Sequence, residues 1–440
     1  MTARSHHPRN SRDPRRVAAA IVLGCLALSA LLPLATARAS RSASLYPAGA
    51  TRPSIRVSRA QLQRGASAGV AGSSARAAPR SRKPAKAVLH GNAARALLAY
   101  EAMQQQYYIP GSGLYVGEPF SYLWPFSTAL AATISLANVH VLANTIDREL
   151  GARLTGLQAY LDNNNSGSSD GTYTSTLPAF DGTVAPPAGP GGTKYYDDND
   201  WVGIELVRLY KLTHNPTVLG YAEGIMAFEI AGWQAGAELA CPGGIPFSNA
   251  PENTDRNTVT TAPAAELAVQ LYRLTGNTQY LVFAESAYEW VRTCLLQPNG
   301  LYADHISRHG KVEQTFWSYN QGTMMGAGAM LYQATGNSAF LYQARQTAKA
   351  ALAYFTPQRL GEEIPFFPSV YFRNLLYLDS ITHDPPGPKI AQAYVNYAWQ
   401  SLRLSNNLFV AGSPASTQLL VQSAIAQIYG LLSSPASTYF

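Results

Sequence analysis

The segment LYKLTHNPTVL, residues 209–219, occurs three times in this chain of 440 residues with small changes. It returns as LYRLTGNTQYL at residues 271–281 and as LYQATGNSAFL at residues 331–341. A fixed spacing of about 60 residues indicates a repeated structural unit. In each copy an apolar run ends at T-G-N or T-H-N, and the next run begins two residues later. This pattern predicts two helices joined by a short turn, with Gly276 and Gly336 in the left-handed position after the first helix.

Apolar residues recur every three to four positions from residue 89 onward, which predicts successive helices and no convincing strand. We expect about 12 helices, near 89–107, 124–142, 144–162, 199–213, 216–233, 260–275, 278–296, 320–335, 338–354, 369–382, 388–404 and 414–431. Six hairpins with apolar faces on both helices close into a ring, so the predicted fold is all-α, an (α/α)6 barrel. An open helical solenoid is the alternative. It fits less well because its repeats are usually shorter, roughly 34 to 47 residues.

Charge is distributed unevenly along the chain. Residues 1–88 hold 16 Lys and Arg and one acid, Asp13, whereas the remainder holds 17 basic and 25 acidic residues. The net charge of +7 therefore comes from the first 88 residues, and the rest of the chain is acidic. This distribution argues against a nucleic-acid-binding protein.

The N-terminal 39 residues resemble a bacterial-type secretion signal, because arginines precede an apolar stretch at 17–37. An uncleaved membrane anchor is the alternative, since the stretch nears the ~20 residues that a spanning helix needs. Residues 40–88, rich in Ala, Ser and Arg, are expected to form a disordered basic linker, and 89–440 a single helical domain. We expect a secreted or envelope-associated protein. Cys241 and Cys294 form either one disulfide or two buried thiols.

The repeat also predicts where a functional site lies. Counting twelve residues back from each repeat tyrosine gives Asp198, Thr260 and Asn320, each at the start of a predicted helix. Equivalent hairpins would bring these helix starts together at one end of the ring. The loops before them are polar, aromatic and rich in glycine, and loops on a rigid scaffold often carry function.

The first of these loops, KYYDDNDW at residues 194–201, crowds three acids into a chain in which only 13% of residues are charged. Carboxylates beside aromatic rings suit sugars, whose hydroxyls need both donors and acceptors. Glycoside cleavage needs two carboxyl groups in different protonation states, and adjacent acids such as Asp197 and Asp198 have separated pKa values. Helix capping is the alternative for this pair. The nearby aromatic residues favour catalysis, with Asp200 interpreted as a first-turn helix charge.

Other chemistries have little support in the sequence. The eight histidines are scattered without metal-binding spacing, and there is no phosphate-binding, dinucleotide-binding or serine-hydrolase motif. His305 and His309 share a loop with Asp304, but a metal there is the less favoured interpretation. We expect no metal and no cofactor.

Several segments, in order along the chain, resemble the signature segments of glycoside hydrolase family 76, the α-1,6-mannanases. They are YYDDNDWVGIELVRLY, GGIPFSN, NTVTTAPAAELAVQLYRLTGN, LLQPNGLYADHI and FWSYNQGTMMGAGAMLYQATGN. The resemblance covers roughly residues 89–430. It implies an (α/α)6 barrel and endo-acting, retaining hydrolysis of α-1,6-mannosidic links without a metal. By motif, it also implies that Asp197 is the nucleophile and Asp198 the general acid/base.

The sequence thus predicts a monomeric, retaining endo-α-1,6-mannanase whose partner is α-1,6-linked mannan, with the N-terminal segment contacting the envelope. The alternatives are an α-1,6-mannan transglycosylase of the cell envelope and a non-catalytic glycan-binding envelope protein. For Tyr195 and Trp201, core packing is an equal alternative to a site role. The candidate substrate-binding residues are Tyr195, Tyr196, Trp201, Thr260, Thr261, Trp317, Tyr319, Asn320 and Gln321.

Overall fold

The structure is a computed structural model that describes residues 90–139, 145–162, 179–383, 386–411 and 416–440. The predicted secretion signal, 1–39, and the predicted linker, 40–88, lie outside these residues. Among the described helices, none combines the length and the apolar character needed to span a membrane.

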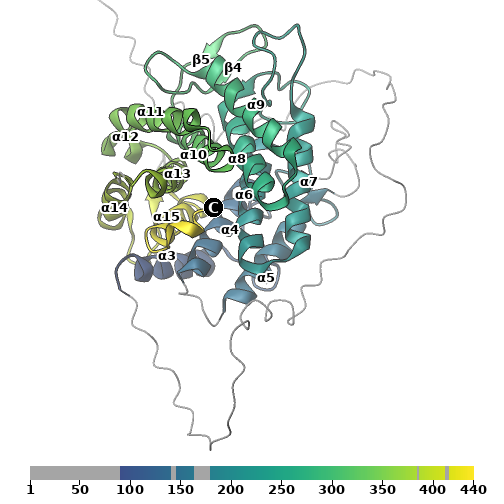
Figure 1. Ribbon diagram of the computed structural model, residues 1–440. Coiled ribbons are helices and arrows are strands. Elements are labelled where there is room, and N and C mark those ends of the chain that lie inside the picture. The colour runs from purple at the N-terminus through teal and green to yellow at the C-terminus, as the bar shows by residue number, and fades with distance from the viewer. Residues whose placement is uncertain (1–89, 140–144, 163–178, 384–385, 412–415) are drawn as a thin grey trace, which may run out of the picture.

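Six helices form an inner ring: α4 (Leu123–Asn138), α6 (Tyr196–Thr213), α8 (Thr258–Thr275), α10 (Ser318–Thr335), α13 (Phe366–Thr382) and α15 (Leu419–Leu431). Each packs against the next in this order, and α15 packs against α4, so the ring closes. Six helices surround it: α3 (Gly91–Tyr107), α5 (Ile146–Gln158), α7 (Pro216–Gly232), α9 (Thr278–Leu295), α11 (Ser338–Tyr354) and α14 (Gly387–Tyr397). Figure 1 shows the two sets, the inner helices toward the middle of the molecule. The closed ring confirms the predicted (α/α)6 barrel and rules out an open solenoid.

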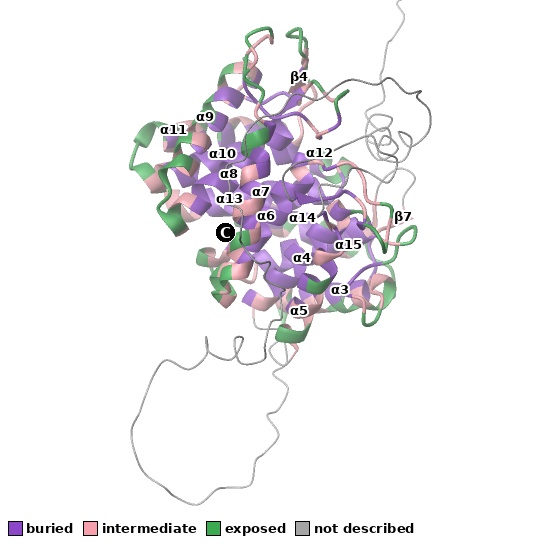
Figure 2. Ribbon diagram, turned by 90° about the vertical axis from the view of Figure 1, so that its right-hand side faces the viewer, coloured by how far each residue is buried: buried purple, intermediate pink, exposed green. Residues whose placement is uncertain are grey.

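Inner and outer helices differ in how much of their surface is buried. In α10 every residue from Ser318 to Leu331 is buried, whereas α9 buries only one face. Figure 2 shows the same contrast, with exposed residues on the outward sides of α9 and α11. Small residues allow the inner helices to approach closely. A Cβ atom on Gly326 of α10 would collide with the side chains of Asn374 and Glu266, so a glycine is needed here for close packing against α8 and α13.

The repeated T-x-N segments form the turns between inner and outer helices. In these three segments the residue after the inner helix is left-handed, with φ of 50° at His214, 73° at Gly276 and 74° at Gly336. The asparagine that follows accepts a hydrogen bond from the backbone N–H two positions on and so caps the next helix. The predicted left-handed glycines are confirmed.

Short elements occupy the connecting loops. They are the helix α12 (Pro357–Glu362), the π-helix η2 (Ala398–Leu402), the 3-10 helix η3 (Ala436–Thr438) and the strands β1 (Leu161–Asp162), β2 (Ala179–Phe180), β3 (Arg256–Asn257), β4 (His305–Ile306), β5 (Val312–Glu313), β6 (Val410–Ala411) and β7 (Ser416–Thr417). The strands pair antiparallel as β1-β2, β3-β4-β5 and β6-β7. The expectation of no strand is therefore wrong for the loops, although each strand has only two residues.

Some predicted helix ends are wrong. The helix predicted over 144–162 ends at Gln158, because the chain then forms β1 and the Asp162 carboxylate binds Lys194. The helix predicted to begin at 199 begins at Tyr196. Asp197 and Asp198 therefore lie inside the first turn of α6. The helix predicted over 124–142 ends at Asn138, and residues 140–142 lie outside the described residues.

Candidate active site

The acid pair lies at the N-terminus of α6, where backbone N–H groups have no partner within the helix. Tyr195 is the N-cap, and its side chain makes no capping bond. After the larger, raising effect of burial, the backbone N–H groups of Asp198 and Asp197 lower the pKa of the Asp197 carboxyl. These N–H groups and the helix dipole favour the ionised form of Asp197.

Buried polar contacts hold this helix start in place. The Lys194 ammonium lies 2.8 Å from a carboxylate oxygen of Asp162 and 2.8 Å from one of Asp181. Asn199, which is completely buried, exchanges two hydrogen bonds of 2.9 Å with the backbone of Phe180. The start of α6 is thus fixed to the β1-β2 segment, so the two acids are held by the scaffold rather than by a free loop.

The starts of α8 and α10 meet the start of α6 at the same end of the ring. The backbone N–H of Thr258, the first residue of α8, bonds to the carbonyl of Asp304 at 2.9 Å. The Asn320 amide in α10 donates to the Asp304 carboxylate at 3.4 Å. Asp304 in turn raises the pKa of Asp197 through charge repulsion. The structure therefore places Asp197, Asp304 and Asn320 around one point on the rim.

The two acids have separate protonation behaviour. Burial raises the pKa of Asp197 to about 7, against the opposing effect of its backbone hydrogen bonds. Burial, and then repulsion from Asp197, raise the pKa of Asp198 well above its usual range. Because two adjacent negative charges repel, the pair loses its protons one at a time. One carboxylate and one carboxylic acid are what general acid/base chemistry on an acetal requires.

Aromatic side chains line the rim beside the acids. Trp124 and Trp317 are half-buried and lie 6.4 Å and 5.3 Å from Phe367, measured between ring centroids. Tyr319 packs at 4.3 Å against Phe367, and its own pKa is raised by burial and then by Asp304 and Asp197. Rings with one open face can stack on pyranose rings.

The other predicted aromatics lie deeper. Trp201 is 4% exposed and packs against Phe366, and Tyr196 stacks on Phe228 of α7 with 4.4 Å between ring centroids. Tyr195 is half-buried and packs at 5.4 Å against Phe247. Trp201 thus belongs to the core beneath the rim.

Three predicted binding residues use their polar atoms internally. The Thr260 hydroxyl donates to the Ile245 carbonyl at 2.7 Å, and the Thr261 hydroxyl accepts from the Ile245 N–H at 3.0 Å. The Gln321 amide bonds to the backbone N–H and carbonyl of Tyr302 at 2.8 Å and 2.9 Å. All three residues are completely buried. They therefore fasten loops to helices and do not present these atoms to a sugar.

The place of a residue in the first turns of its inner helix explains why its side chain bonds to a neighbouring backbone segment. Asn199, Thr261, Gln321 and Gln422 each lie four residues after the N-cap of an inner helix. Each side chain bonds to a backbone segment that passes outside the helix, at Phe180, Ile245, Tyr302 and Phe409 respectively. The residue three after the N-cap is Asp198 in α6 and Asn320 in α10, where the Asn320 amide donates to the Asp304 carboxylate although Asn320 is itself completely buried. One step along the helix thus separates a fastening residue from a candidate site residue.

Sequence reasoning did not identify two acids of this rim as site residues. Asp304 was considered only as a metal ligand, and in the structure it lies 3.0 Å from the His305 ring nitrogen Nδ1. This hydrogen bond raises the pKa of His305. Glu363 follows α12, outside the repeats, and accepts bonds from the backbone N–H and hydroxyl of Ser318 at the start of α10. Burial raises the pKa of Glu363 to about 8.

Asp200 is not a first-turn helix charge, contrary to expectation. It is completely buried, and neither of its carboxylate oxygens has a hydrogen-bond partner among the described residues. Glu229 of α7 and Glu266 of α8 are likewise completely buried and raise the pKa of Asp200 after the larger effect of burial itself. A lone Asp two residues after a DD pair gives no sequence signal that distinguishes a buried acid from an exposed one.

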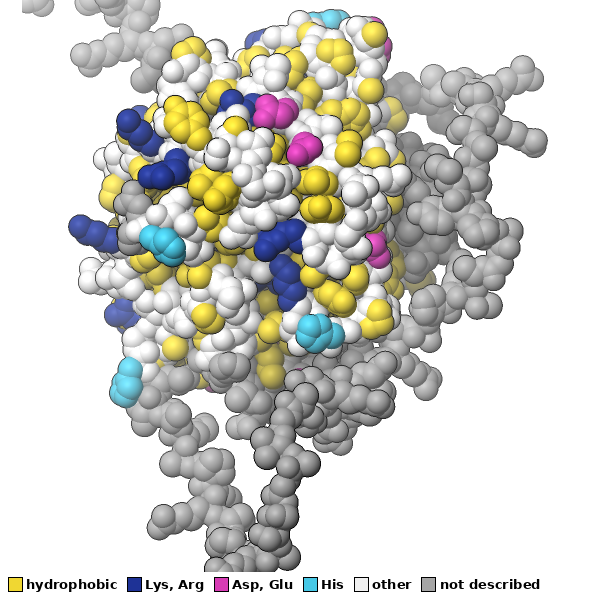
Figure 3. Space-filling model, viewed as in Figure 1, with side chains coloured by type: hydrophobic (Ala, Val, Ile, Leu, Met, Phe, Trp, Pro, Cys, Tyr) yellow, Lys and Arg dark blue, Asp and Glu magenta, His cyan; other side chains and the backbone are white. Residues whose placement is uncertain are grey.

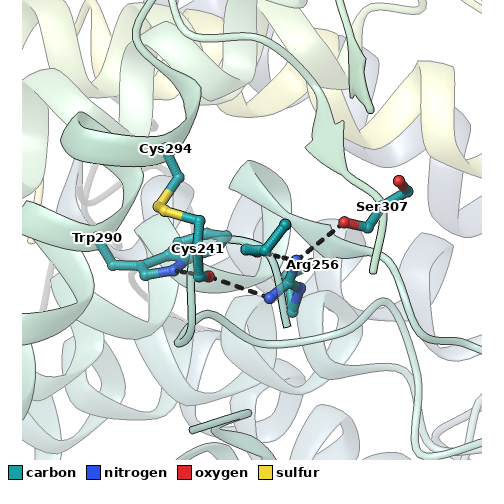
Figure 4. The surroundings of a disulfide bond; sticks show 6 residues. Cys241, Arg256, Trp290, Cys294 and Ser307 are labelled. Atoms are coloured by element: carbon teal, nitrogen blue, oxygen red, sulfur yellow. Dashed lines mark hydrogen bonds between the residues drawn. A yellow bond between two sulfur atoms is a disulfide. The ribbon is translucent and has the colours of Figure 1, made fainter. Parts of the chain in front are cut away.

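A disulfide between Cys241 and Cys294 ties the loop before α8 to the end of α9, with 6.2 Å between Cα atoms. Figure 4 shows Arg256 beside it, donating to the carbonyl oxygens of Cys241 and Ser307 at 3.1 Å and 3.0 Å. The Trp290 indole N–H donates to the same Cys241 carbonyl at 3.1 Å. Of the two alternatives for the cysteines, the structure contains the disulfide.

Charged side chains do not form a single basic stripe on the face shown in Figure 3, where Lys and Arg are interspersed with other residues. Within the described ranges, no group of three or more His, Cys, Asp or Glu residues is placed to hold a metal ion. The absence of metal and cofactor requirements stays a prediction.

Comparisons with known proteins agree with this geometry. The family described as "Glycosyl hydrolase family 76" matches residues 94–369. The chain is 33% identical over 106 residues to the mannan endo-1,6-alpha-mannosidase DCW1 of Saccharomyces cerevisiae, and 28% identical over 117 residues to DFG5 of Candida albicans. These matches span 24% and 26% of the relatives' own lengths and 23% and 24% of this chain.

Solved structures share the fold. The glycoside hydrolase family 76 mannosidase Bt3792 of Bacteroides thetaiotaomicron superposes with a TM-score of 0.67 at 20% identity, over 78% of this chain and 98% of that one. The α-1,6-mannanase GH76A of Salegentibacter sp. HEL1_6 superposes with a TM-score of 0.64 at 19% identity, over 78% of this chain and 99% of that one. That structure is an inactive variant, with two consecutive aspartates replaced by asparagine, in complex with α-1,6-mannotriose.

Proposed function

Because this chain belongs to glycosyl hydrolase family 76, we propose that it hydrolyses α-1,6-mannosidic links in mannan with retention at the anomeric carbon. The observation that carries the proposal is the Asp197–Asp198 pair at the start of α6, in which Asp198 is buried, Asp197 is half-buried and both pKa values are raised. The consecutive aspartates replaced in the inactive Salegentibacter mannanase support the same pair as catalytic. The bound mannotriose in that structure, and the names of the fungal relatives, support the substrate.

In the first step the Asp197 carboxylate attacks the anomeric carbon of a mannose residue. The bond to the leaving oxygen breaks, and Asp198 donates its proton to that oxygen. Asp197 is suited to this role because the backbone N–H groups at the helix start favour its ionised form. The product is a mannosyl-enzyme ester and a released chain end with a free hydroxyl.

In the second step water replaces Asp197 at the anomeric carbon. Asp198, now ionised, removes a proton from the water, and the Asp197 carboxylate leaves. Both acids return to their starting states. Asp304 and Asn320, which are hydrogen-bonded to each other beside Asp197, are proposed to contact sugar hydroxyls, and Trp124 and Trp317 to stack on sugar rings.

The proposal is tested with Asp197→Asn and Asp198→Asn. Each substitution is expected to abolish the release of reducing ends from α-1,6-mannan, a loss of at least a thousandfold, while the melting temperature changes by only a few degrees. NMR of the first product measures its anomeric configuration. An inverted product would contradict the nucleophile role of Asp197, and residual activity in an unstable variant would indicate helix capping instead.

Water and a second sugar compete for the mannosyl-enzyme. Adding an acceptor oligosaccharide and analysing product lengths distinguishes hydrolysis from transglycosylation. We expect shortened products to dominate. Longer products would assign the chain to the transglycosylase alternative, and binding without any cleavage would assign it to the glycan-binding alternative.

We also propose that the protein works outside the cytoplasm or in the envelope. The described disulfide supports this location, because disulfides persist in oxidising compartments. The arginine-rich start and the apolar stretch of the N-terminal 39 residues support export. N-terminal sequencing of the mature protein tests it, and a mature chain that begins at Met1 would contradict a cleaved signal.

A further inference from the structure

A second pocket lies at the same end of the barrel as the acid pair, but neither Asp197 nor Asp198 lines it. Its volume is about 240 Å³. One wall is the loop between α7 and α8, and another is Arg308 in the turn between β4 and β5. Tyr196, the first residue of α6, also lines it. The pocket and the acids therefore share α6 as a dividing wall.

The polar lining of this pocket is largely free of protein partners. Within the described part of the chain, no hydrogen bond or ion pair is found for the side chains of Glu238, Asn253, Thr254 and Arg308. The Asn249 side-chain oxygen accepts a bond from the Lys194 N–H at 3.0 Å, which leaves its amide N–H groups free. Glu238, Thr254 and Arg308 are exposed, so their polar groups meet water at the open side of the cavity, where a ligand exchanges these hydrogen bonds to water for its own.

The lining also indicates the class of ligand. Glu238 and Arg308 carry opposite charges, so their formal charges cancel and do not select an anion or a cation. Amide, hydroxyl, carboxylate and guanidinium groups together offer both donors and acceptors, which matches sugar hydroxyls that act as both. A volume of about 240 Å³ is below the roughly 300–1,000 Å³ of pockets for drug-sized ligands, which suits a single ring.

The pocket is mechanically joined to the catalytic helix start. The Tyr196 N–H bonds to the Phe247 carbonyl at 3.1 Å, and the Asn249 N–H bonds to the Lys194 carbonyl at 3.1 Å. Tyr195 and Ser248 form a β-bridge between the same two segments. A ligand held by the loop is therefore held at a fixed place relative to Asp197, one residue beyond Tyr196.

We propose that this pocket is a second carbohydrate site that holds one neutral pyranose ring of the polysaccharide while the acids act on another ring. The inference rests on the proposed function, because it assigns the pocket to the same substrate. It adds that part of the binding energy for mannan comes from outside the rim around Asp304 and Asn320.

The test measures affinity for α-1,6-mannooligosaccharides of increasing length, by calorimetry, in the Asp197→Asn/Asp198→Asn protein. Affinity is expected to rise stepwise at the length that first reaches the pocket. Thr254→Trp fills the pocket, and it is expected to remove the step and weaken binding of the longer chains roughly tenfold, as expected for losing one or two hydrogen bonds. Arg308→Ala is expected to act in the same direction and serves if the tryptophan variant does not fold.

Arg345→Ala is the matched control, because Arg345 is an exposed arginine on α11 that does not line the pocket. The Arg345→Ala variant is expected to keep the stepwise rise in affinity with oligosaccharide length. The same variants in the active protein separate the two hypotheses. If mannan is cleaved and Thr254→Trp keeps the wild-type length dependence, the pocket proposal is wrong and the proposed function stands. If the intact protein neither binds nor cleaves α-1,6-mannan, both are wrong.

Discussion

Asp197 and Asp198 occupy successive positions in the first turn of α6, yet they experience different surroundings. The backbone N–H groups at the helix start lower the pKa of Asp197 and so oppose the larger effect of burial. For Asp198, burial raises the pKa and repulsion from Asp197 adds to it. The two carboxyl groups thus differ in their surroundings, which agrees with the proposed nucleophile at Asp197 and the proposed general acid/base at Asp198. The same position that suggested capping is what makes the two residues unequal.

This division predicts the pH dependence of catalysis. We expect kcat/KM to rise as pH increases through about 7, because Asp197 must lose its proton to attack. At higher pH kcat/KM falls as Asp198 loses the proton that it must donate. The profile is measured on α-1,6-mannan, with circular dichroism at each pH as the control for folding. An acidic limb near the ordinary carboxyl pKa of about 4 would contradict the effect of burial.

The burial of Asp200 leads to a second prediction, which concerns how the stability of the folded protein depends on pH. Its pKa is raised in the folded state, so the folded protein keeps a proton that the unfolded chain releases above about pH 4. Its contribution to stability is therefore full below that pH and is lost as pH rises toward the folded-state pKa. Asp200→Asn removes this dependence. Its melting temperature is expected to fall less than that of the wild type between about pH 5 and pH 8.

Glu101→Gln is the control for this experiment, because Glu101 is an exposed carboxyl on α3. It is expected to leave the pH dependence of the melting temperature unchanged. Parallel curves for Asp200→Asn and the wild type would show that Asp200 is ionised in the folded protein. Glu229 and Glu266 remain in the variant, so part of the dependence is expected to persist.

At the scale of single elements, four inner helices share the same side-chain-to-backbone hydrogen bonding near their N-termini. The side chain four residues after the N-cap fastens a passing backbone segment, as Asn199 does in α6 and Gln422 does in α15. These amides, and the Thr261 hydroxyl in α8, supply hydrogen bonds to backbone groups that have no strand partner. They explain how loops of irregular backbone form a rigid rim.

Two matched substitutions test the contribution of these hydrogen bonds to stability and to catalysis. Asn199→Ala and Gln422→Ala each leave buried backbone groups without a partner, so each is expected to lower the free energy of unfolding by about 1–3 kcal/mol. Asn199→Ala is also expected to lower kcat for mannan, because Asn199 fixes the helix start that carries the acids. Urea unfolding and initial rates measure the two effects. Equal kcat in both variants would show that the fastening does not position the acids.

Much of the helical framework was predictable because it repeats. The 60-residue period and the T-x-N turns identified the hairpins, and the same register placed Asp198 and Asn320 on one rim. The register could not separate Thr261 and Gln321 from site residues, since all of them lie within one helical turn of the rim. Only the path of the neighbouring backbone decides whether such a side chain faces outward or inward.

Other features of the site and the fold could not be predicted from the sequence, for physical reasons. Asp304, in the loop between α9 and α10, affects the pKa of Asp197 in α6, and Glu363, in the connection between α12 and α13, accepts a hydrogen bond from Ser318 at the start of α10. Both contacts join segments that are distant in sequence and have no counterpart in local sequence pattern. Two-residue strands such as β3 and β4 are likewise too short to leave a period of two.

At the scale of the whole molecule, the disulfide joins two consecutive hairpins. Cys241 and Cys294 are separated by 53 residues, for which chain entropy gives a stabilisation of roughly 4 kcal/mol. Cys241→Ala/Cys294→Ala is expected to lower the free energy of unfolding by about 2–4 kcal/mol, measured by urea denaturation.

Reducing agent provides the control for the cysteine variant. It is expected to destabilise the wild type by a similar amount and to leave the double variant unchanged. If the reductant shifts both proteins equally, its effect does not arise from this bond. Because the disulfide also holds the loop before α8, the KM for mannan is expected to rise in the variant while kcat stays near the wild-type value.

Ring closure has a consequence for the order in which the chain can fold. The inner surface of α4 is covered by α15, and α3 also packs on α15, although about 280 residues separate α4 from α15 in sequence. During synthesis the apolar face of α4 therefore has no final partner until nearly the whole chain exists. Such distant contacts form slowly, so we expect the docking of α15 against α4 to be a late step of folding. Until α15 has been synthesised, this face of α4 has no native partner to cover it.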